Sequence, residues 1–447
     1  MTTNSSGDFK FRLMLPIHTS INYSKCGEHM YALAERLYPI CRSITGNGVR
    51  ETLRLINDEI PLTIVETPTG TAVFDWVVPY EWNIRDAYIK NSNGVKIVDF
   101  QKSNLHILNY SIPIKARMRL DALRPHLFSL PEFPDWIPHR TSYFNDNWGF
   151  CITHQQLENL PDDDYDIVID STLEPGALTY GEFIIPGMSE EQILLFAHCC
   201  HPSLANDNLS GIAMVVELAK IISSSSPRYT YRCVFAPAAI GCITWISNNQ
   251  SELAKVKLGM VAALLGHPGK LTYKKTVTGS TLIDRASLHV LRHRNEPFDT
   301  LEFSPFGYDE RQFASPGINL PVGRLTRTPN GAYPEYHTSA DNMNLIQPNA
   351  MADSLSVYHA IFQLIENNHV YQSNFPFCEP QLGKRGLYRT TGGHGNPEQQ
   401  QIARLWILNQ ANGQRDLLEI AERSGLKFEI IADAAAELTA ADVIRIV

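Results

Sequence analysis

No stretch of this 447-residue sequence reaches the roughly 18 consecutive apolar residues that a membrane-spanning helix requires. The sequence also has fewer basic than acidic residues. It contains 38 Lys and Arg and 47 Asp and Glu, which gives a net charge of −9. General binding to nucleic acid or to an anionic membrane is therefore not expected, since both need a basic surface. Residues 1–24 are expected to form a loose leader, in which a charged pair interrupts the apolar region that a signal peptide would need.

Cysteine pairs with metal-binding or disulfide spacing are missing as well. The eight cysteines are scattered, mostly inside apolar runs, and none belongs to a CxxC pair. We therefore expect reduced, buried thiols and a cytoplasmic protein. The remaining composition, 44% hydrophobic and 19% charged, is ordinary for a folded chain of two or three domains.

Strand-like and helical runs alternate through most of the chain, which predicts an α/β sheet built from βαβ units. Strands are expected at 165–169, 181–185, 192–197, 231–236, 259–265 and 318–322, and helices at 28–56 with a break at 42–48, 210–222, 240–248, 284–292 and 351–366.

A second pattern interrupts this alternation. Between residues 61 and 111, short β-rich runs alternate with turn signals, and Asn91-Ser92-Asn93-Gly94 is a hairpin signal. We therefore expect a discontinuous α/β domain over 25–65 and 148–375, with an inserted β-rich domain over 66–147.

The last part of the chain forms a separate unit. Three short segments with helical periodicity follow Cys378 and end in a β-branched run, which predicts a winged-helix-like domain over residues 376–447. Residues 384–447 contain eight basic and eight acidic residues. Because a helix that reads DNA should be basic, a packing or interaction role is favoured over DNA binding.

The richest chemistry lies between Gln192 and Ile222. A buried strand is predicted to run into a polar turn that contains His198, His201 and Asp207, and a helix follows. Ligands of open α/β sheets bind beyond the carboxyl ends of the strands, and imidazole with carboxylate is zinc-type ligand chemistry. Adjacent residues of an extended chain point to opposite sides, so Cys199 and Cys200 are expected to be buried thiols rather than joint ligands.

Three further segments carry polar groups that can have a function or a purely structural role. His337, in the run Pro334 to Asn342, is the natural distant ligand of a two-segment metal site. Asp309, Glu310 and Arg311 form either a solvated turn or a substrate clamp, in which a carboxylate holds an amine or a metal. Arg42, before Gly46, marks either a helix break or an anion site, and the helix break is favoured.

Together these segments resemble the zinc aminopeptidase family with a co-catalytic metal pair. They are still more similar to its bacterial branch of aminopeptidase-like proteins, which are often encoded among polysaccharide-biosynthesis genes. The resemblance covers nearly the whole chain, through YPICRSITGNGVR, FDWVVPYEWNIRDAYI, SNLHILNYS, WGFC, AHCCHPSLANDNLSG, GYDERQF, YPEYHTSADN and LGKRGLY. It implies a mixed α/β sheet flanked by helices, an inserted small all-β domain and a C-terminal winged helix.

The resemblance also implies roles for single residues. His198 would bind one metal, Asp207 would bridge two metals, and His337 would bind the other. A water held by the metals would attack a peptide carbonyl, because zinc can lower the pKa of water to roughly 7.

Two stretches depart from the family pattern. Ala238 and Ala239 stand where the family has its catalytic Glu and a Glu ligand, and His267 stands where it has an Asp ligand. A single metal held by some combination of His198, Asp207, His267 and His337 then becomes an alternative to the pair. The general base must come from elsewhere, and Glu310, Asp309, Glu335 and His201 are its candidates.

The expected function is that of a zinc-dependent aminopeptidase-like hydrolase with one or two zinc ions. It would act on an amide bond of a small amino-acid-conjugated metabolite, by hydrolysis, transfer or amide formation. Arg311, Tyr336 and His201 are the candidate substrate contacts, and the partner is a small-molecule or short peptide-like substrate rather than nucleic acid or membrane. A homo-oligomer is left open, and the alternative is a non-catalytic binding or scaffold protein that keeps the peptidase fold.

Overall fold

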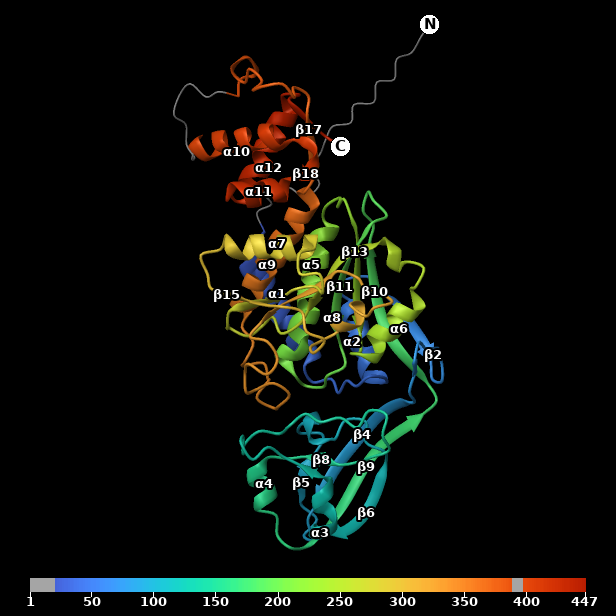
Figure 1. Ribbon diagram of the computed structural model, residues 1–447. Helices are drawn as coiled ribbons and strands as arrows, with labels where there is room; N and C mark the ends of the chain where they lie inside the picture. The colour runs from blue at the N-terminus through green and yellow to red at the C-terminus, as the bar shows by residue number, and fades with distance from the viewer. Residues whose placement is uncertain (1–20, 388–396) are drawn as a thin grey trace.

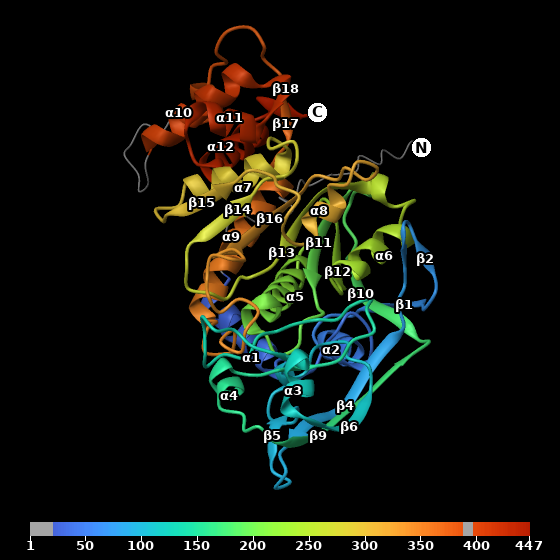
Figure 2. The same cartoon turned by 60° about the horizontal axis from the view of Figure 1, so that its bottom comes forward.

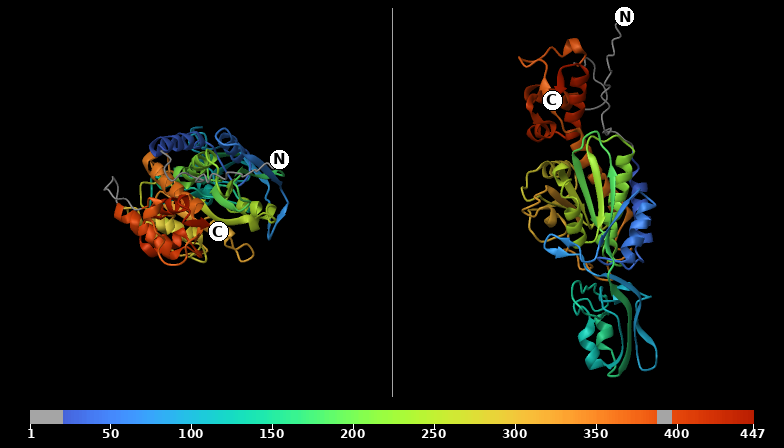
Figure 3. Two further views of the ribbon diagram at one scale, coloured as in Figure 1. Left: turned by 90° about the horizontal axis from the view of Figure 1, so that it is seen from above. Right: turned by 90° about the vertical axis from the view of Figure 1, so that its right-hand side faces the viewer.

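Three parts follow one another along the long axis of the molecule (Figure 1). The computed structural model describes residues 21–387 and 397–447, so most of the expected leader at 1–24 lies outside the described residues. A central α/β part carries a β-rich part at one end and a mostly helical C-terminal part at the other (Figure 3, right). No helix among the described residues is both long and apolar enough to cross a membrane.

The central part is built on an eight-stranded mixed sheet with the order β1-β10-β12-β11-β13-β16-β14-β15. Its four middle strands, β12, β11, β13 and β16, are parallel, whereas β10 and β14 run antiparallel to their neighbours in this group. The strands are β1 (Thr63–Pro68), β10 (Ala177–Ile185), β11 (Gln192–His198), β12 (Thr230–Ala236), β13 (Val256–Ala262), β14 (Leu271–Lys274), β15 (Phe298–Leu301) and β16 (Val322–Arg327).

Every residue of β11 is buried, which explains the unbroken apolar run ILLFA in its sequence. A parallel strand with both faces covered needs apolar side chains on both faces rather than alternation. The expected strand at 318–322 forms four residues later, as Val322–Arg327, directly after Pro321. The short edge strands β14 and β15 were not predicted.

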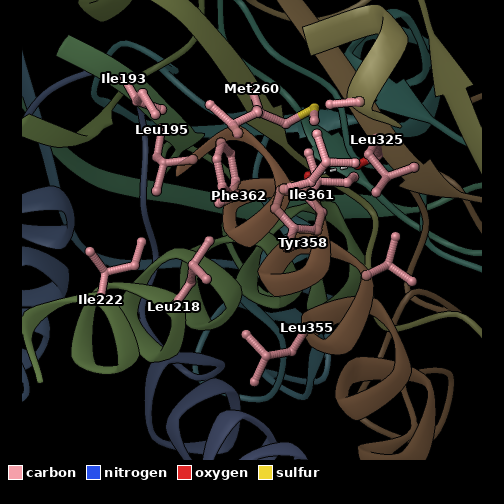
Figure 4. Packing of buried hydrophobic residues seen from close by; sticks show 14 of the residues in the cluster. Ile193, Leu195, Leu218, Ile222, Met260, Leu325, Leu355, Tyr358, Ile361 and Phe362 are labelled. Atoms are coloured by element: carbon pink, nitrogen blue, oxygen red, sulfur yellow. Dashed lines mark hydrogen bonds between the residues drawn. The ribbon is translucent and has the colours of Figure 1, made fainter. Parts of the chain in front are cut away.

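Helices cover both faces of this sheet. The helices of the central part are α1 (Tyr23–Leu37), α2 (Asn47–Asn57), α5 (Ser210–Ser223), α6 (Ile240–Asn248), α7 (Leu282–Arg292), α8 (Glu310–Phe313) and α9 (Pro348–Asn367). The larger core joins the sheet to α1, α2, α5, α7 and α9, while α6 and α8 pack in the core of the opposite face. Figure 4 shows Tyr358 and Phe362 of α9 between the strands and Leu218 of α5. Burial of one such side chain contributes about 1.5–3 kcal/mol.

The β-rich part is a four-stranded antiparallel sheet with the order β5-β4-β9-β6. Its strands are β4 (Glu81–Lys90), β5 (Lys96–Asp99), β6 (Ile114–Arg119) and β9 (Asp164–Glu174). The long strands β4 and β9 lead out of the central part and back into it (Figure 2). Shorter elements complete this region: α3 (Leu120–Leu123), β7 (Leu127–Phe128), β8 (Phe150–Cys151) and α4 (His154–Glu158). The short hairpin of β2 (Ala72–Val73) and β3 (Trp76–Val77) lies beside α6 of the central part (Figure 1).

The strand predicted at 165–169 therefore exists, but it belongs to the small sheet and not to the large one. Tyr165, Ile167 and Ile169 are buried and alternate with more exposed neighbours, as in an antiparallel strand with one covered face. A middle strand of the large sheet would read as a continuous apolar run instead. The small sheet consequently reaches Glu174, beyond the limit of residue 147 that the sequence suggested.

The C-terminal part combines three helices with a three-stranded sheet. The helices are α10 (Pro397–Gln410), α11 (Leu417–Ser424) and α12 (Phe428–Ala440), and the strands are β17 (Val370–Ser373), β18 (Asn412–Asp416) and β19 (Ile444–Ile446). Because β17 pairs with both β18 and β19, this unit begins directly after α9, before residue 376. Arg285 of α7 binds Asp416 and Glu422 and ties the unit to the central part.

Candidate metal centre

The centre of the site is the carboxylate of Asp207, which is fully buried. Its Oδ1 atom lies 2.9 Å from Nε2 of His198, and its Oδ2 atom lies 3.0 Å from Nε2 of His337. His201 approaches the same Oδ1 atom with its Nδ1 at 3.9 Å. Three imidazoles from two distant segments thus surround one carboxylate.

The end of β11 and the turn after it place two of these groups. His198 is the last residue of β11, at the carboxyl end of the parallel strands, and Asp207 follows in the irregular turn before α5. The carboxylate of Asp341 accepts hydrogen bonds from the backbone N–H groups of Asn206 (2.6 Å) and Asp207 (3.1 Å). Asp341 is therefore a positioning residue that the sequence analysis did not single out.

His337 reaches the site from the loop between β16 and α9. Its backbone has a positive φ of 57°, a conformation that few residues other than glycine adopt. Its ring is stacked on Tyr336 with centroids 4.0 Å apart, and its carbonyl accepts a hydrogen bond from the N–H of His139 (2.7 Å). About a third of the His337 side chain is exposed, so the group around Asp207 opens to solvent on this side.

His139 is a fourth imidazole that the sequence analysis missed. Its ring lies 5.5 Å from that of His201 and 5.3 Å from that of His337, centroid to centroid. Residues 137–139 are held there by a β-bridge between Pro138 and Thr338. A lone His in a proline-rich loop carries no spacing signal, so only the docking of this loop onto residues 337–339 reveals it.

Electrostatics favour the charged carboxylate of Asp207 and the neutral imidazoles of His139 and His201. Burial alone would raise the pKa of Asp207, but His201, His198 and His337 hold it well below its usual value. Burial lowers the pKa of His139 to about 3 and that of His201 well below its usual range. The neutral imidazole of His201 beside the ionised carboxylate of Asp207 is in the protonation state that a metal ion needs.

The donor set fits one zinc ion. The ligand atoms of His198, His201 and Asp207 all lie within 4.8 Å of one another. Zinc binds imidazole nitrogen and carboxylate oxygen at about 2.0–2.2 Å, so two ligands of one ion lie up to about 4 Å apart. Small side-chain movements would suffice to bring these three residues around one ion. His337 contacts the other oxygen of Asp207. These two groups could form a second metal position, which would have fewer protein ligands than the first.

Comparison with known proteins identifies the family to which the chain belongs. The model for the domain of unknown function DUF4910 matches residues 31–368, and the model for a winged helix-turn-helix matches residues 369–446. The chain belongs to the DUF4910 family.

A protein of Clostridium acetobutylicum is 48% identical over 426 residues, which are 95% of this chain and 98% of that protein. Its name assigns it provisionally to polysaccharide biosynthesis and gives it an aminopeptidase-like domain. A crystal structure of a provisionally named peptidase from the same organism has a TM-score of 0.91 at 47% identity, and covers 95% of this chain and 98% of that one.

More distant structures share the fold of the central part. A zinc aminopeptidase from Bacillus subtilis has a TM-score of 0.54 at 13% identity, covering 75% of this chain and 94% of that one. A peptidase M28 precursor from Shewanella amazonensis has a TM-score of 0.55 at 13% identity, covering 77% and 95%. The predictions of an aminopeptidase-like α/β fold and of a C-terminal winged helix are confirmed.

In this DUF4910 protein, His267 does not join the group around Asp207. Its Nδ1 atom accepts a hydrogen bond from the N–H of Gly269 (3.0 Å). The same atom lies 2.8 Å from the Thr328 hydroxyl. In the neutral ring the proton then sits on Nε2, which leaves no lone pair there for a metal. The compact group of ligand atoms instead contains His201, and the role of His267 as a fourth ligand stays a prediction.

Glu310 and Asp309 are both buried, but they face different surroundings. Oε1 of Glu310 lies 2.9 Å from Nζ of Lys274 and 3.4 Å from Nη1 of Arg324. Neither oxygen of Asp309 accepts a conventional N–H or O–H hydrogen bond among the described residues, and the side chain lies beside the thiol of Cys242 and close enough to His198 for its charge to lower the Asp309 pKa. Burial raises the pKa of Asp309 to about 7.

The remaining candidates have simpler positions. Arg311 is exposed, and Glu335 lies close enough to His267 to influence its pKa. The Tyr336 ring is stacked on that of His337, and its role as a substrate contact stays a prediction. Arg42 is buried and donates hydrogen bonds to the carbonyls of residues 201 and 202, so it supports the turn rather than binding an anion. Cys199 and Cys200 are buried free thiols, as expected.

Proposed function

We propose that this chain is a metal-dependent enzyme of aminopeptidase type that acts on an amide bond of a small, amino-acid-conjugated metabolite. The observation that carries the proposal is the buried Asp207 carboxylate, whose two oxygens lie 2.9 Å and 3.0 Å from imidazole nitrogens of His198 and His337. A purely structural core has no need for this donor set, since buried charges are costly unless they are paired or bind a metal. When bound, zinc would acidify water and polarise a carbonyl.

His198, His201 and Asp207 are the residues proposed to hold one zinc ion. These three are the only described residues whose ligand atoms form a compact group of His, Cys, Asp or Glu side chains. His337 and the second oxygen of Asp207 offer only two ligands for another ion. We therefore expect one tightly bound zinc and at most a weak second one.

Asp309 is the proposed proton acceptor. The family's usual carboxylates are absent at Ala238 and Ala239, but Asp309 lies beside Cys242, only three residues further along the chain. A carboxylate from the start of α8 thus reaches the region that lacks one. Neither of its oxygens accepts a conventional N–H or O–H hydrogen bond among the described residues, and a pKa of about 7 suits a base that works near neutral pH.

Tyr308 is the proposed donor to the oxygen on which charge develops during attack. Its ring stacks on that of His198 with centroids 5.1 Å apart, and its buried hydroxyl has no hydrogen-bond partner among the described residues. Burial raises the pKa of Tyr308 well above its usual value, so the hydroxyl stays protonated and can donate. A donor that is already in place stabilises developing negative charge without reorganisation.

The direction of the reaction and its setting are part of the same proposal. Hydrolysis needs water at the site, whereas transfer or amide formation would need water to be kept out. The eight cysteines are all free, which is compatible with the proposed cytoplasmic setting. The name of the Clostridium relative supports a substrate connected with polysaccharide synthesis.

The full-length chain, purified and incubated with zinc, should contain about one equivalent of tightly bound metal by elemental analysis. It should then release p-nitroaniline from aminoacyl p-nitroanilides, or the amine from N-acylated amino acids. A protein that binds no zinc would overturn the proposal. One that binds zinc but turns over no amide would favour the alternative of a scaffold that keeps the peptidase fold, which is motivated by the alanines at 238 and 239.

A further inference from the structure

A second group of buried charges lies next to the candidate metal centre. Lys274 of β14 and Arg324 of β16 are partners in the antiparallel pairing of these strands, and Glu310 at the start of α8 contacts both. The three side chains are 2%, 3% and 0% exposed, respectively. The group therefore contains two cations and one carboxylate.

Lys274 is satisfied within the protein. Its ammonium group donates to Oε1 of Glu310 (2.9 Å), the carbonyl of Ser304 (2.7 Å) and the carbonyl of Phe306 (2.8 Å). These three acceptors match the three protons of the group. All three protons of Lys274 are thus used, whereas Oε2 of Glu310 has no hydrogen-bond partner among the described residues.

Arg324 is not satisfied in the same way. Its five N–H donors make one long hydrogen bond, from Nη1 to Asn330 (3.5 Å), and Nε has no partner among the described residues. Its ionic contact at 3.4 Å is to the Glu310 oxygen that already binds Lys274. A buried guanidinium with so few acceptors is unfavourable unless an anion completes it.

Arg324 is also connected to the metal centre through one aromatic ring. The Cζ atom of Arg324 lies 5.1 Å from the ring centroid of Tyr308, and this ring is stacked on His198 at 5.1 Å. The Tyr308 ring therefore contacts both Arg324 and a proposed metal ligand.

We infer that Arg324 binds a carboxylate of the substrate. The planar fork of the guanidinium matches a carboxylate in two parallel hydrogen bonds, which a lysine cannot provide. Because the Tyr308 ring contacts both Arg324 and His198, we place the carboxylate in the same small molecule as the amide that reacts. This inference rests on the proposed function and narrows its substrate to a small acidic molecule.

Two sources of this carboxylate are chemically reasonable, an acidic amino acid and a sugar acid. Isothermal titration of the zinc-loaded full-length chain with glutamate, glutamine, glucuronate and glucose distinguishes them. One of the two acids should bind at least ten-fold more tightly than its neutral counterpart. In Arg324→Gln this difference should disappear, while the zinc content stays unchanged.

The matched control is Lys275→Gln, which removes a neighbouring cation that is paired with the exposed Glu302 and should keep the preference for the acid. A second readout excludes a purely structural role. Because Arg324 is poorly satisfied, Arg324→Gln should unfold at the same temperature as the parent or higher, whereas loss of a structural arginine would lower that temperature.

Equal binding of acid and neutral counterpart, or binding of neither acid, would overturn the inference. A clear fall in unfolding temperature or in zinc content in Arg324→Gln would overturn it too. If the parent chain binds no zinc, the proposed function fails. The same titrations with the metal-free protein then test the role of Arg324 separately. A preference for the acid that disappears in Arg324→Gln would still support carboxylate binding by Arg324.

Discussion

The Nε2 atom of His337 lies 3.0 Å from Oδ2 of Asp207, although 130 residues separate the two along the chain. The contact depends on the docking of the loop before α9 onto the turn after β11. Asp341 of that loop accepts hydrogen bonds from the backbone N–H groups of Asn206 and Asp207 and so fixes the turn. The site is therefore assembled from two segments that hold each other in place.

Replacing Asp207 or His198 by Ala should remove both the zinc and the activity. Asp207 lies within hydrogen-bond distance of His198 and His337 and 3.9 Å from His201, and without its charge the remaining ligands bind a dication weakly. Elemental analysis and amide turnover of each variant measure the two effects. His154→Ala, which changes a histidine of α4 in the β-rich part, serves as the control and should keep both. Retention of zinc by Asp207→Ala would contradict the assignment.

His201→Ala and His267→Ala should differ sharply in zinc affinity. The His201 ring belongs to the compact ligand group, whereas His267 is engaged with Gly269 and Thr328. We expect His201→Ala to weaken zinc binding by about a hundred-fold or more, and His267→Ala to leave it within a few-fold. Competition with a chromophoric chelator measures both affinities. The reverse order would restore the ligand set expected from sequence.

Asp309→Asn should lower amide turnover by about 10²- to 10⁴-fold while zinc stays bound, because a general base contributes roughly this factor. Burial raises the pKa of Asp309 to about 7, so parent activity should rise with pH through that value as the carboxylate forms. The asparagine variant should lack this rise. Asp135→Asn, at an exposed position, is the matched control. Undiminished turnover in Asp309→Asn would exclude Asp309 as the base.

Glu310→Gln should destabilise the protein rather than remove its chemistry. The change leaves Lys274 and Arg324 buried without a counter-charge, and breaking such a pair costs about 3–5 kcal/mol. Urea unfolding measures the free energy of unfolding. Glu302→Gln, which breaks the exposed pair with Lys275, should cost less than about 1 kcal/mol. A stable but inactive Glu310→Gln would instead support Glu310 as the base.

Acid should destabilise the fold through buried histidines outside the site. Burial lowers the pKa of His289, His359 and His369 to about 4, below the roughly 6.5 of an unfolded chain. The unfolded chain therefore binds more protons between these values, so their contribution to stability is complete above pH 6.5 and is lost as the pH falls towards 4.

The test compares unfolding temperatures at pH 7.5 and pH 4.5. His359→Gln should lose fewer degrees between the two than the parent, whereas His29→Gln, at an exposed position, should behave like the parent. The comparison between variants is needed because Asp309 acts in the opposite direction. Its pKa is raised in the folded protein, so its contribution to stability increases as the pH falls. An identical loss in parent and His359→Gln would refute the role of His359.

Much of the fold could be predicted because local patterns decide it. The apolar run before His198 and the helical spacing after Ser210 predict β11 and α5 within a residue or two. The strand at Asp164–Glu174 was predicted as an element but assigned to the wrong sheet. Which strands pair depends on contacts between residues far apart in the sequence. For this strand, only the alternation of buried and more exposed residues indicates that it belongs to an antiparallel sheet.

The sequence by itself determined the family, the order of the elements and the residues His198, Asp207 and His337, because strand, turn and helix signals are local and their motifs are long. Only the tertiary structure decided which groups meet. Docking of remote loops brings His139 and Asp341 to the site, hydrogen bonds with Gly269 and Thr328 engage His267, and Lys274 engages Glu310. A side chain's chemistry is set by its neighbours, and for these residues the neighbours lie on segments distant in the sequence.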